Sequence, residues 1–176
     1  MKTDARVRYT KMIIQQSFVE QLKVYPLNKI TVKKICATAE INRATFYKHY
    51  HDCYDLMKQM EDKLIIDLKE LIFESRDQNL ENIFGKILEK FKEKKELYLV
   101  LFSENGDSTF PAKIFELCYD LAVKNNKKKE ITQEWLYYFL AYGCSGVLNR
   151  WISSGMKEDI YEVSAFIGNI SEKVLK

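Results

Sequence analysis

The segment that most constrains the fold spans residues 31–50 and reads TVKKICATAEINRATFYKHY. Thr31 and Asn42 are residues of the kind that cap helix N-termini, so the segment predicts two short helices around a tight turn. In the second helix, Phe46 and Tyr50 recur at the spacing of a buried face. Its other positions carry basic, hydroxyl and imidazole side chains, which is typical of a helix that enters the major groove of DNA.

The position of each polar residue predicts what it contacts. Arg43 lies in the first turn of the second helix, where a guanidinium reaches O6 and N7 of a guanine. Ala44 is small and allows a close approach to a thymine methyl, while the start of the first helix favours phosphate. We therefore expect DNA contacts from Thr31, Lys33, Arg43, Ala44, Thr45, Tyr47, Lys48 and His49. The alternative for each residue taken alone is a solvated side chain or, for Tyr47, half-buried packing.

The charge of the chain is divided unevenly along its length. Residues 1–50 hold ten Lys or Arg and three Asp or Glu, a net charge of +7, whereas residues 51–176 have a net charge of −4. A basic head on an acidic body is consistent with nucleic-acid binding at one end, although chance clustering is the alternative.

The rest of the chain predicts an all-α fold. It contains only 6 Gly and 2 Pro, which favours helices with short loops. Apolar residues at helical spacing predict further helices at about 4–23, 53–75, 80–92, 95–103, 111–124, 132–153 and 158–175, with a loop at 104–111 and a linker at 125–130. We expect an N-terminal three-helix helix-turn-helix domain, residues 1–52, joined by the fourth helix to a C-terminal helical bundle, residues 53–176, about nine helices in all.

Cysteine usage and hydropathy bear on location. Cys36, Cys53, Cys118 and Cys144 lie far apart without a C-x-x-C pair, and the N-terminus lacks an apolar signal core. These features predict reduced thiols and a cytoplasmic protein. The longest run without charge, residues 135–149, is too short to span a bilayer, so we expect no membrane partner.

Catalysis and metal binding have little support. The chain lacks a P-loop, a G-x-G-x-x-G, an H-E-x-x-H and a serine in a glycine elbow, so we expect neither an enzyme nor a cofactor. Its two histidines both lie in the N-terminal unit. A zinc site formed by His49, His51 and Cys53 is the alternative, but His49 faces the expected DNA side and we predict no metal.

The segment ITVKKICATAEINRATFYKHYHDCYDLM, residues 30–57, resembles the helix-turn-helix of TetR-family (AcrR/TetR-type) transcriptional regulators, and the resemblance extends to about residue 68. It rests on Thr31, Ile35, Ala39, Ile41, Asn42, Thr45, Phe46, Tyr47, His49, Tyr50 and Leu56. Farther on, AYGCSGVLNRWISSGMKEDIYEV is similar to a Firmicute-type subgroup that includes activators of dihydroxyacetone-kinase operons. That similarity rests on Gly143, Gly146, Trp151, Gly155 and Met156.

Three positions depart from the family pattern. Glu40 stands where Gly is usual in the turn, and a positive φ there costs about 1 kcal/mol, so we expect the turn to adopt different dihedrals. Cys36 replaces a usual Ala and should pack equally well. Cys53 stands where many members carry a phosphate-binding Lys, so we expect that contact to be missing.

The resemblance implies a homodimer in which the last two helices of each subunit form a four-helix interface. The aromatic-rich stretch 135–151, with small residues at Gly143 and Gly146, also allows this by itself, although a central core helix is the alternative. The expected interface residues are Trp135, Phe139, Gly143, Gly146, Val147, Trp151, Phe166 and Ile170.

The resemblance also implies a ligand pocket in the C-terminal domain. Candidate lining residues are Tyr98, Phe102, Phe110, Tyr119, Tyr138 and Tyr142, for which ordinary core packing is the alternative.

These features together predict a sequence-specific DNA-binding regulator acting as a homodimer on a pseudo-palindromic operator of double-stranded DNA. The resemblance implies that a small-molecule effector or a partner protein moves the fourth helix and changes the separation of the two recognition helices. The alternative is a helical protein-interaction module, or co-regulator, without specific DNA binding.

Overall fold

The computed structural model describes residues 2–106, 109–124 and 131–175, and all regular structure within them is helical. The helices are α1 (Lys2–Leu22), α2 (Val32–Thr38), α3 (Arg43–Tyr47), α4 (Cys53–Glu74), α5 (Leu80–Glu93), α6 (Lys95–Leu101), α7 (Phe110–Lys124), α8 (Ile131–Ser153) and α9 (Ile160–Leu175), with a 3-10 turn, η1 (Leu27–Lys29). The all-α prediction is confirmed. None of these helices is both long enough and apolar enough to cross a membrane.

The predicted helix bounds differ from the observed ones mainly at loops. Phe110 and Pro111 belong to the first turn of α7 rather than to the preceding loop, because Pro needs no N–H bond in a first turn. The last helix begins at Ile160 instead of residue 158. The expected linker at 125–130 lies outside the described residues.

Side-chain caps fix where the helices begin. The Thr31 hydroxyl accepts a hydrogen bond from the Lys34 N–H at 3.3 Å, and Asn42 Oδ1 accepts one from the Thr45 N–H at 2.7 Å. Asp52 Oδ1 caps α4 by accepting from the Asp55 N–H at 2.8 Å. Each cap satisfies an N–H group that has no partner inside its helix.

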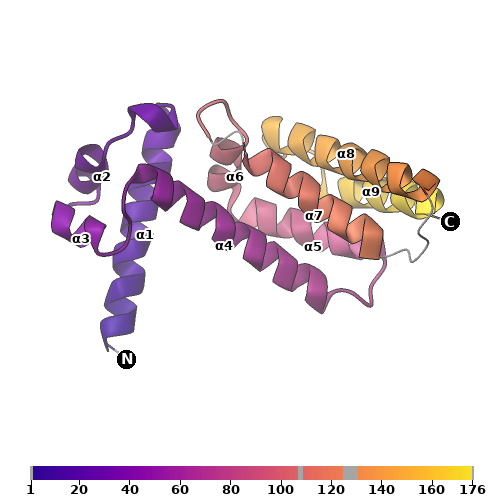
Figure 1. Cartoon of the computed structure of the whole chain (residues 1–176), viewed down its shortest axis with the longest axis horizontal. Coiled ribbons are helices and arrows are strands. Elements are labelled where there is room, and N and C mark those ends of the chain that lie inside the picture. The colour runs from indigo at the N-terminus through magenta and orange to yellow at the C-terminus, as the bar shows by residue number, and fades with distance from the viewer. Residues whose placement is uncertain (1, 107–108, 125–130, 176) are drawn as a thin grey trace.

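The helices form two groups joined by α4 (Figure 1). The first three, which we call the head, lie at one end of the molecule, and α5–α9, which we call the bundle, lie at the other. The core of the head is formed by Ile14, Phe18, Leu22, Ile35, Phe46 and Tyr50, and the first turns of α4 complete it with Leu56 and Met57. The predicted boundary after residue 52 coincides with the N-cap of α4, and this helix continues directly into the bundle.

Polar contacts connect the head and α4 to the bundle. Lys23 Nζ in the turn after α1 lies 2.8 Å from both Glu20 and Glu96, and the Leu27 N–H donates to the Asn105 carbonyl at 3.3 Å. On α4, Glu61 is only 1% exposed and lies 2.8 Å from Lys113 Nζ of α7.

The lysine of α7 is shared between two carboxylates. Lys113 Nζ also lies 3.1 Å from Asp62. Burial lowers the pKa of Lys113, but hydrogen bonds to Glu61 and Asp62 outweigh it and raise the pKa. The lysine is therefore charged at neutral pH, and α7 is tied to α4 two turns beyond the head.

Within the bundle, α5 packs along α9 and α7 along α8. The closest approach of α5 and α9 is at Gly168, where an added Cβ would lie 2.7 Å from the backbone N and Cα of Glu81. Backbone atoms cannot move aside as a flexible side chain can, so this position of α9 requires glycine.

We expect Gly168→Ala to lower the free energy of unfolding by about 1–3 kcal/mol, the usual cost of overpacking. Gly85→Ala is the matched control, because it lies in the same α5–α9 contact and its added Cβ would meet only Ser164 at ordinary distances, 3.8 Å and beyond. The control should be neutral or slightly stabilising because alanine favours helix. Urea unfolding followed by circular dichroism measures both, and equal midpoints would contradict the close contact.

Candidate nucleic-acid interface

The turn between α2 and α3 sets the position of α3. The Ile41 N–H donates to the Cys36 carbonyl at 3.0 Å and the Glu40 N–H to the Ala37 carbonyl at 3.4 Å, which is the Schellman pattern of a helix C-terminus. Glu40 has φ 52°, so the expectation that its turn avoids positive φ is wrong. The hydrogen bonds and the buried side chains of α2 and α3 on either side hold the backbone there despite the local cost.

The turn after α8 has the same hydrogen-bond pattern as the turn after α2. There the Met156 N–H donates to the Trp151 carbonyl and the Gly155 N–H to the Ile152 carbonyl, both at 2.9 Å. Gly155 takes φ 88° in the position that Glu40 occupies after α2. The turn after α8 therefore has a glycine where the turn after α2 has a residue with a side chain.

The five residues of α3 divide between core and solvent. Phe46 and, just beyond the helix, Tyr50 are buried against α1, and the Tyr50 hydroxyl accepts a hydrogen bond from Gln15 at 3.2 Å. The opposite side of the helix is exposed. The eight residues predicted to contact DNA are all exposed or partly exposed: Thr31, Lys33, Arg43, Ala44, Thr45, Tyr47, Lys48 and His49. Their contact with DNA stays a prediction.

His49 has an environment that keeps it neutral. Burial, together with the positive charges of Lys11 and Lys48, lowers its pKa. A neutral imidazole has one N–H donor and one acceptor, so His49 can donate a hydrogen bond to a phosphate oxygen without carrying a charge of its own.

The arrangement considered for zinc is not assembled in the described residues, where no three His, Cys, Asp or Glu side chains gather. Cys53 is buried while His51 is exposed. Burial and the nearby Asp52 raise the pKa of the Cys53 thiol to about 11, so it is protonated, whereas zinc requires a thiolate. Because Cys53 is buried, its side chain is not placed at the surface to contact a phosphate.

The six residues predicted to line a ligand pocket fall into two groups. The first group is Tyr98, Phe102 and Phe110, of which Tyr98 and Phe110 are buried. The Tyr98 ring centroid lies 4.3 Å from that of Phe91, and the Phe102 centroid lies 5.6 Å from that of Phe110. The other three, Tyr119, Tyr138 and Tyr142, stack with Phe115 on the outside of α7 and α8. The lining of one ligand pocket by these six residues stays a prediction.

A cavity of about 580 Å³ lies elsewhere in the bundle, between α4, α5 and α7. Apolar side chains form most of its wall, and three charged residues lie among them: Ile72, Phe73, Ile83, Leu117 and Leu121 with Lys69, Arg76 and Asp120. Residues 69, 72 and 73 occupy one face of α4 at helical spacing, and Arg76 lies in the turn just beyond the helix. The sequence signal was this segment, in which Lys69 and Arg76 flank two apolar residues.

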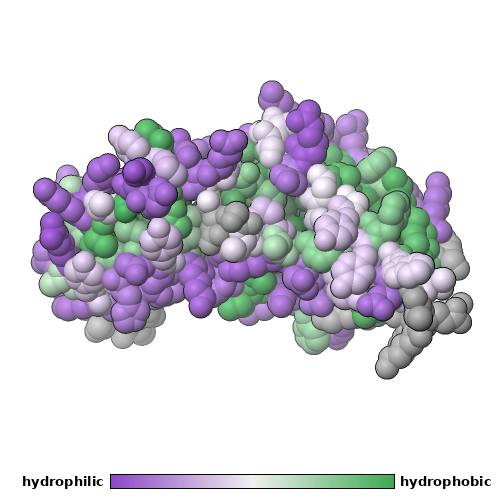
Figure 2. Space-filling model, turned by 45° about the horizontal axis from the view of Figure 1, so that its top comes forward, coloured by the Kyte–Doolittle hydropathy of each residue, from purple (hydrophilic) through white to green (hydrophobic). Residues whose placement is uncertain are grey.

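An unpartnered apolar surface covers α8 and α9. Phe139 and Trp135 are each 68% exposed, Phe166 and Ile170 are exposed beside them, and Val147 is half-buried. Gly143 and Gly146 lie open, since an added Cβ would meet nothing within 4 Å. Figure 2 shows apolar surface gathered over the bundle end of the molecule.

Trp151 lies at the edge of this surface, where it lines a hollow of about 440 Å³ together with Gly143, Gly146 and Val147. It is largely buried, and its Nε1 donates to the Glu158 carbonyl at 3.1 Å. The indole therefore also holds the connection between α8 and α9, and its contact with a second subunit stays a prediction.

The C-terminal region of the chain matches a family model. Residues 78–173 match TetR_C_8, described as a transcriptional regulator C-terminal region. The chain belongs to the TetR family of transcriptional regulators. A search of curated proteins gave no match for this TetR-family regulator.

Solved structures share the fold of this TetR-family regulator. The dihydroxyacetone kinase operon activator DhaS is 19% identical, with 94% of this chain and 96% of that chain covered and a TM-score of 0.67. A TetR regulator from Streptococcus agalactiae 2603V is 23% identical, with coverage of 97% and 98% and a TM-score of 0.70. NalD, the secondary repressor of the MexAB-OprM efflux pump in Pseudomonas aeruginosa, is 15% identical, with coverage of 96% for both chains and a TM-score of 0.68.

The strained turn of this TetR-family regulator gives a test of the head. We expect Glu40→Gly to unfold at higher urea than Glu40→Ala, by about 0.5–1 kcal/mol in free energy, because only glycine relieves the positive φ. Both variants remove the same charge, so electrostatics cancels in the comparison. Identical stabilities would show that the turn stores no strain.

Proposed function

We propose that this TetR-family regulator is a cytoplasmic homodimer that binds a pseudo-palindromic operator, with residues 1–52 as the DNA-binding domain. Residues 53–176 form the dimerisation and effector-binding domain. The observation that carries the proposal is the exposed row Arg43, Ala44, Tyr47 and Lys48 on a helix whose other face is locked into the core. A net charge of +7 over residues 1–50 supports contact with phosphate.

The residues of this row have different tasks. Arg43, in the first turn of α3, reads a guanine edge, and Ala44 lets the helix come close to the bases. Lys48 at the other end of α3 binds phosphate, as does the N-terminus of α2 at Thr31 and Lys33. Base contacts give sequence preference, and phosphate contacts give affinity and register.

Dimerisation uses the apolar surface of α8 and α9. Large exposed rings such as Phe139 and Phe166 lie beside the open glycines of α8. A hollow of about 240 Å³, lined in part by Gly143, Val147 and Ile170, lies between these rings. An isologous contact of two such surfaces buries the rings and places the two heads side by side.

The effector acts through α4. This helix lines the cavity of the bundle with Ile72 and Phe73, and its first turns form part of the head core at Cys53 and Leu56. A ligand in the cavity shifts α4 relative to α7 and thereby changes the separation of the two α3 helices. A coupling free energy of about 1–3 kcal/mol suffices for regulation.

The DNA-binding proposal is tested by competition binding to DNA upstream of the chain's own gene at physiological salt. Arg43→Ala should lose discrimination between that DNA and random duplex, worth about 1–3 kcal/mol. Lys48→Ala should weaken binding to both alike and reduce the salt slope by about one. If the unaltered protein binds both duplexes equally, the protein-interaction module becomes the better account.

The dimer proposal is tested by Phe139→Glu, which places a charge on the α8 surface. We expect sedimentation to change from a dimer to a monomer, because a carboxylate would be buried without a partner. Phe73→Glu on α4 is the matched control, since Phe73 is 67% exposed and Phe139 is 68% exposed. A dimer that survives Phe139→Glu, or one that is lost equally in the control, contradicts this interface.

A further inference from the structure

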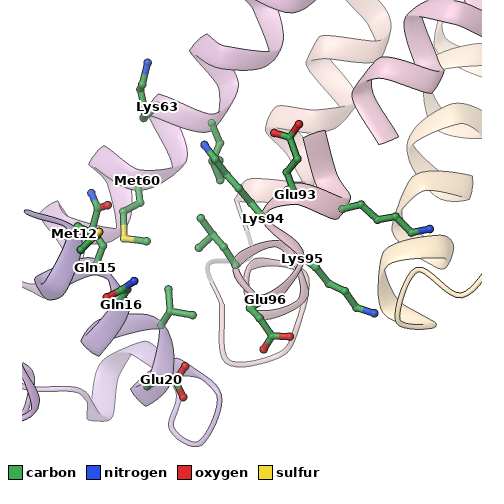
Figure 3. Close-up of a pocket in the computed structure, with 14 residues that line it drawn as sticks. Met12, Gln15, Gln16, Glu20, Met60, Lys63, Glu93, Lys94, Lys95 and Glu96 are labelled. Carbon is green, nitrogen blue, oxygen red and sulfur yellow. The ribbon is translucent and has the colours of Figure 1, made fainter. Parts of the chain in front are cut away.

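A second cavity separates the head from the bundle. It has a volume of about 660 Å³ and lies between α1 and α6, with α4 on a third side (Figure 3). We call it the head–bundle cleft. It shares no lining residue with the cavity between α4, α5 and α7. Neither the DNA-contacting row nor the dimer surface reaches it.

The middle of the head–bundle cleft is apolar. Five apolar side chains contribute from three helices: Met12 and Val19 from α1, Met60 and Leu64 from α4, and Leu97 from α6. Figure 3 shows the Met12 and Met60 side chains on the same side of the cleft, opposite α6. Methionine side chains are flexible and polarisable, so they adapt to ligands of different shape.

Most charged residues of the cleft are held in ion pairs, and the others extend outward. Glu20 and Glu96 both pair with Lys23, and Glu93 pairs with Lys90 at 2.7 Å. Asp67 pairs with Lys63 at 2.7 Å and with Lys94 at 3.2 Å. Lys92 is exposed to solvent, and the Lys95 side chain extends away from α1 in Figure 3.

Two uncharged polar side chains also line the cleft. The amides of Gln15 and Gln16 line the cleft from α1. The Gln15 N–H₂ group donates one hydrogen bond to the Tyr50 hydroxyl at 3.2 Å, and an amide has a second N–H and a carbonyl oxygen for further partners. A charged ligand would lose its hydration here without gaining an opposite charge. A neutral ligand loses little hydration free energy, and it gains apolar contacts and a hydrogen bond to an amide.

We propose that the head–bundle cleft is a binding site for a neutral, largely apolar small molecule. Its volume falls within the range of about 300–1,000 Å³ that is usual for ligand sites, and it lies between two structural units, where such sites are common. Because one wall belongs to the head and the opposite wall to the bundle, the bound molecule also fixes the orientation of the head. This last step rests on the proposed function, whereas binding itself does not.

Two dyes with the same ring system test the class of ligand. N-phenyl-1-naphthylamine is neutral, and 8-anilinonaphthalene-1-sulfonate is the same molecule with a sulfonate. We expect saturable fluorescence enhancement of the neutral dye in the head–bundle cleft. The sulfonated dye should instead bind at the cavity that carries Lys69 and Arg76, so Lys69→Gln with Arg76→Gln should weaken only the sulfonated dye.

The position of the neutral dye is read from methionine methyl NMR signals of the unaltered protein. Met12 and Met60 line the cleft, whereas Met156 is buried at the end of α8. Shifts of the Met12 and Met60 methyl signals with an unmoved Met156 signal support the site. Unmoved Met12 and Met60 signals at saturating dye, or an absence of binding, overturn it.

A variant that fills the cleft provides an independent test. Met12→Trp adds bulk in the cleft at a residue that is 44% exposed, so the larger ring is not forced into the core. We expect about a tenfold or greater loss of affinity for the neutral dye. Tyr9→Trp on the same helix is the control, because Tyr9 is exposed and does not line the cleft. If the two variants bind the neutral dye with equal affinity, the proposal is overturned. A changed sedimentation mass in Met12→Trp also overturns it, because it would show that the cleft is an interface between copies of the chain.

Coupling to DNA is tested separately by operator affinity with and without saturating neutral dye. We expect the dye to change the affinity of the unaltered protein and to leave that of Met12→Trp unchanged. If the operator is bound but the dye has no effect, the coupling is overturned. If the operator is not bound at all while the dye still shifts Met12 and Met60, the proposed function fails and the cleft remains a ligand site.

Discussion

The ion pair between Glu61 of α4 and Lys113 of α7 is the contact on which the arrangement of head and bundle depends. Glu61 is almost fully buried, so removing the lysine would leave a carboxylate out of water, at a cost of about 3–5 kcal/mol. Such a pair adds little net stability compared with apolar residues, but it permits few alternative geometries. It therefore restricts how α4 crosses α7, and the direction of α4 determines where the head lies.

Two cavities border α4. The cleft is lined by Met60 and Leu64, at the level of Glu61, and the other cavity by Ile72 and Phe73, farther along the helix. A helix bordered by two spaces can shift where it faces them. The packing of α4 thus combines one firm contact with two regions where movement displaces little protein, which is an arrangement suited to regulation.

Local chemistry explains what the sequence predicted well. Thr31 and Asn42 are caps whose hydrogen bonds span only three residues, so no tertiary information was needed to place α2 and α3. The division of α3 into a buried and an exposed face also follows from spacing alone, through Phe46 and Tyr50.

The positive φ of Glu40 was missed because the hydrogen bonds and packing of the turn outweigh a local preference. The aromatic residues proposed for a pocket could not be sorted, because helical spacing does not say whether Tyr98 or Tyr138 faces the core.

The separation of charge along the molecule has a kinetic consequence. The basic residues concentrate in the head at one end, and the acidic excess lies in the remainder of the chain (Figure 1). A body charged in this way has a large permanent electric dipole, and near an anionic polymer it turns head-first before any contact forms. Productive encounters become more frequent than random tumbling allows. The Debye length shortens as salt is added, so this orienting torque, and with it the association rate, declines well before the folded structure is affected.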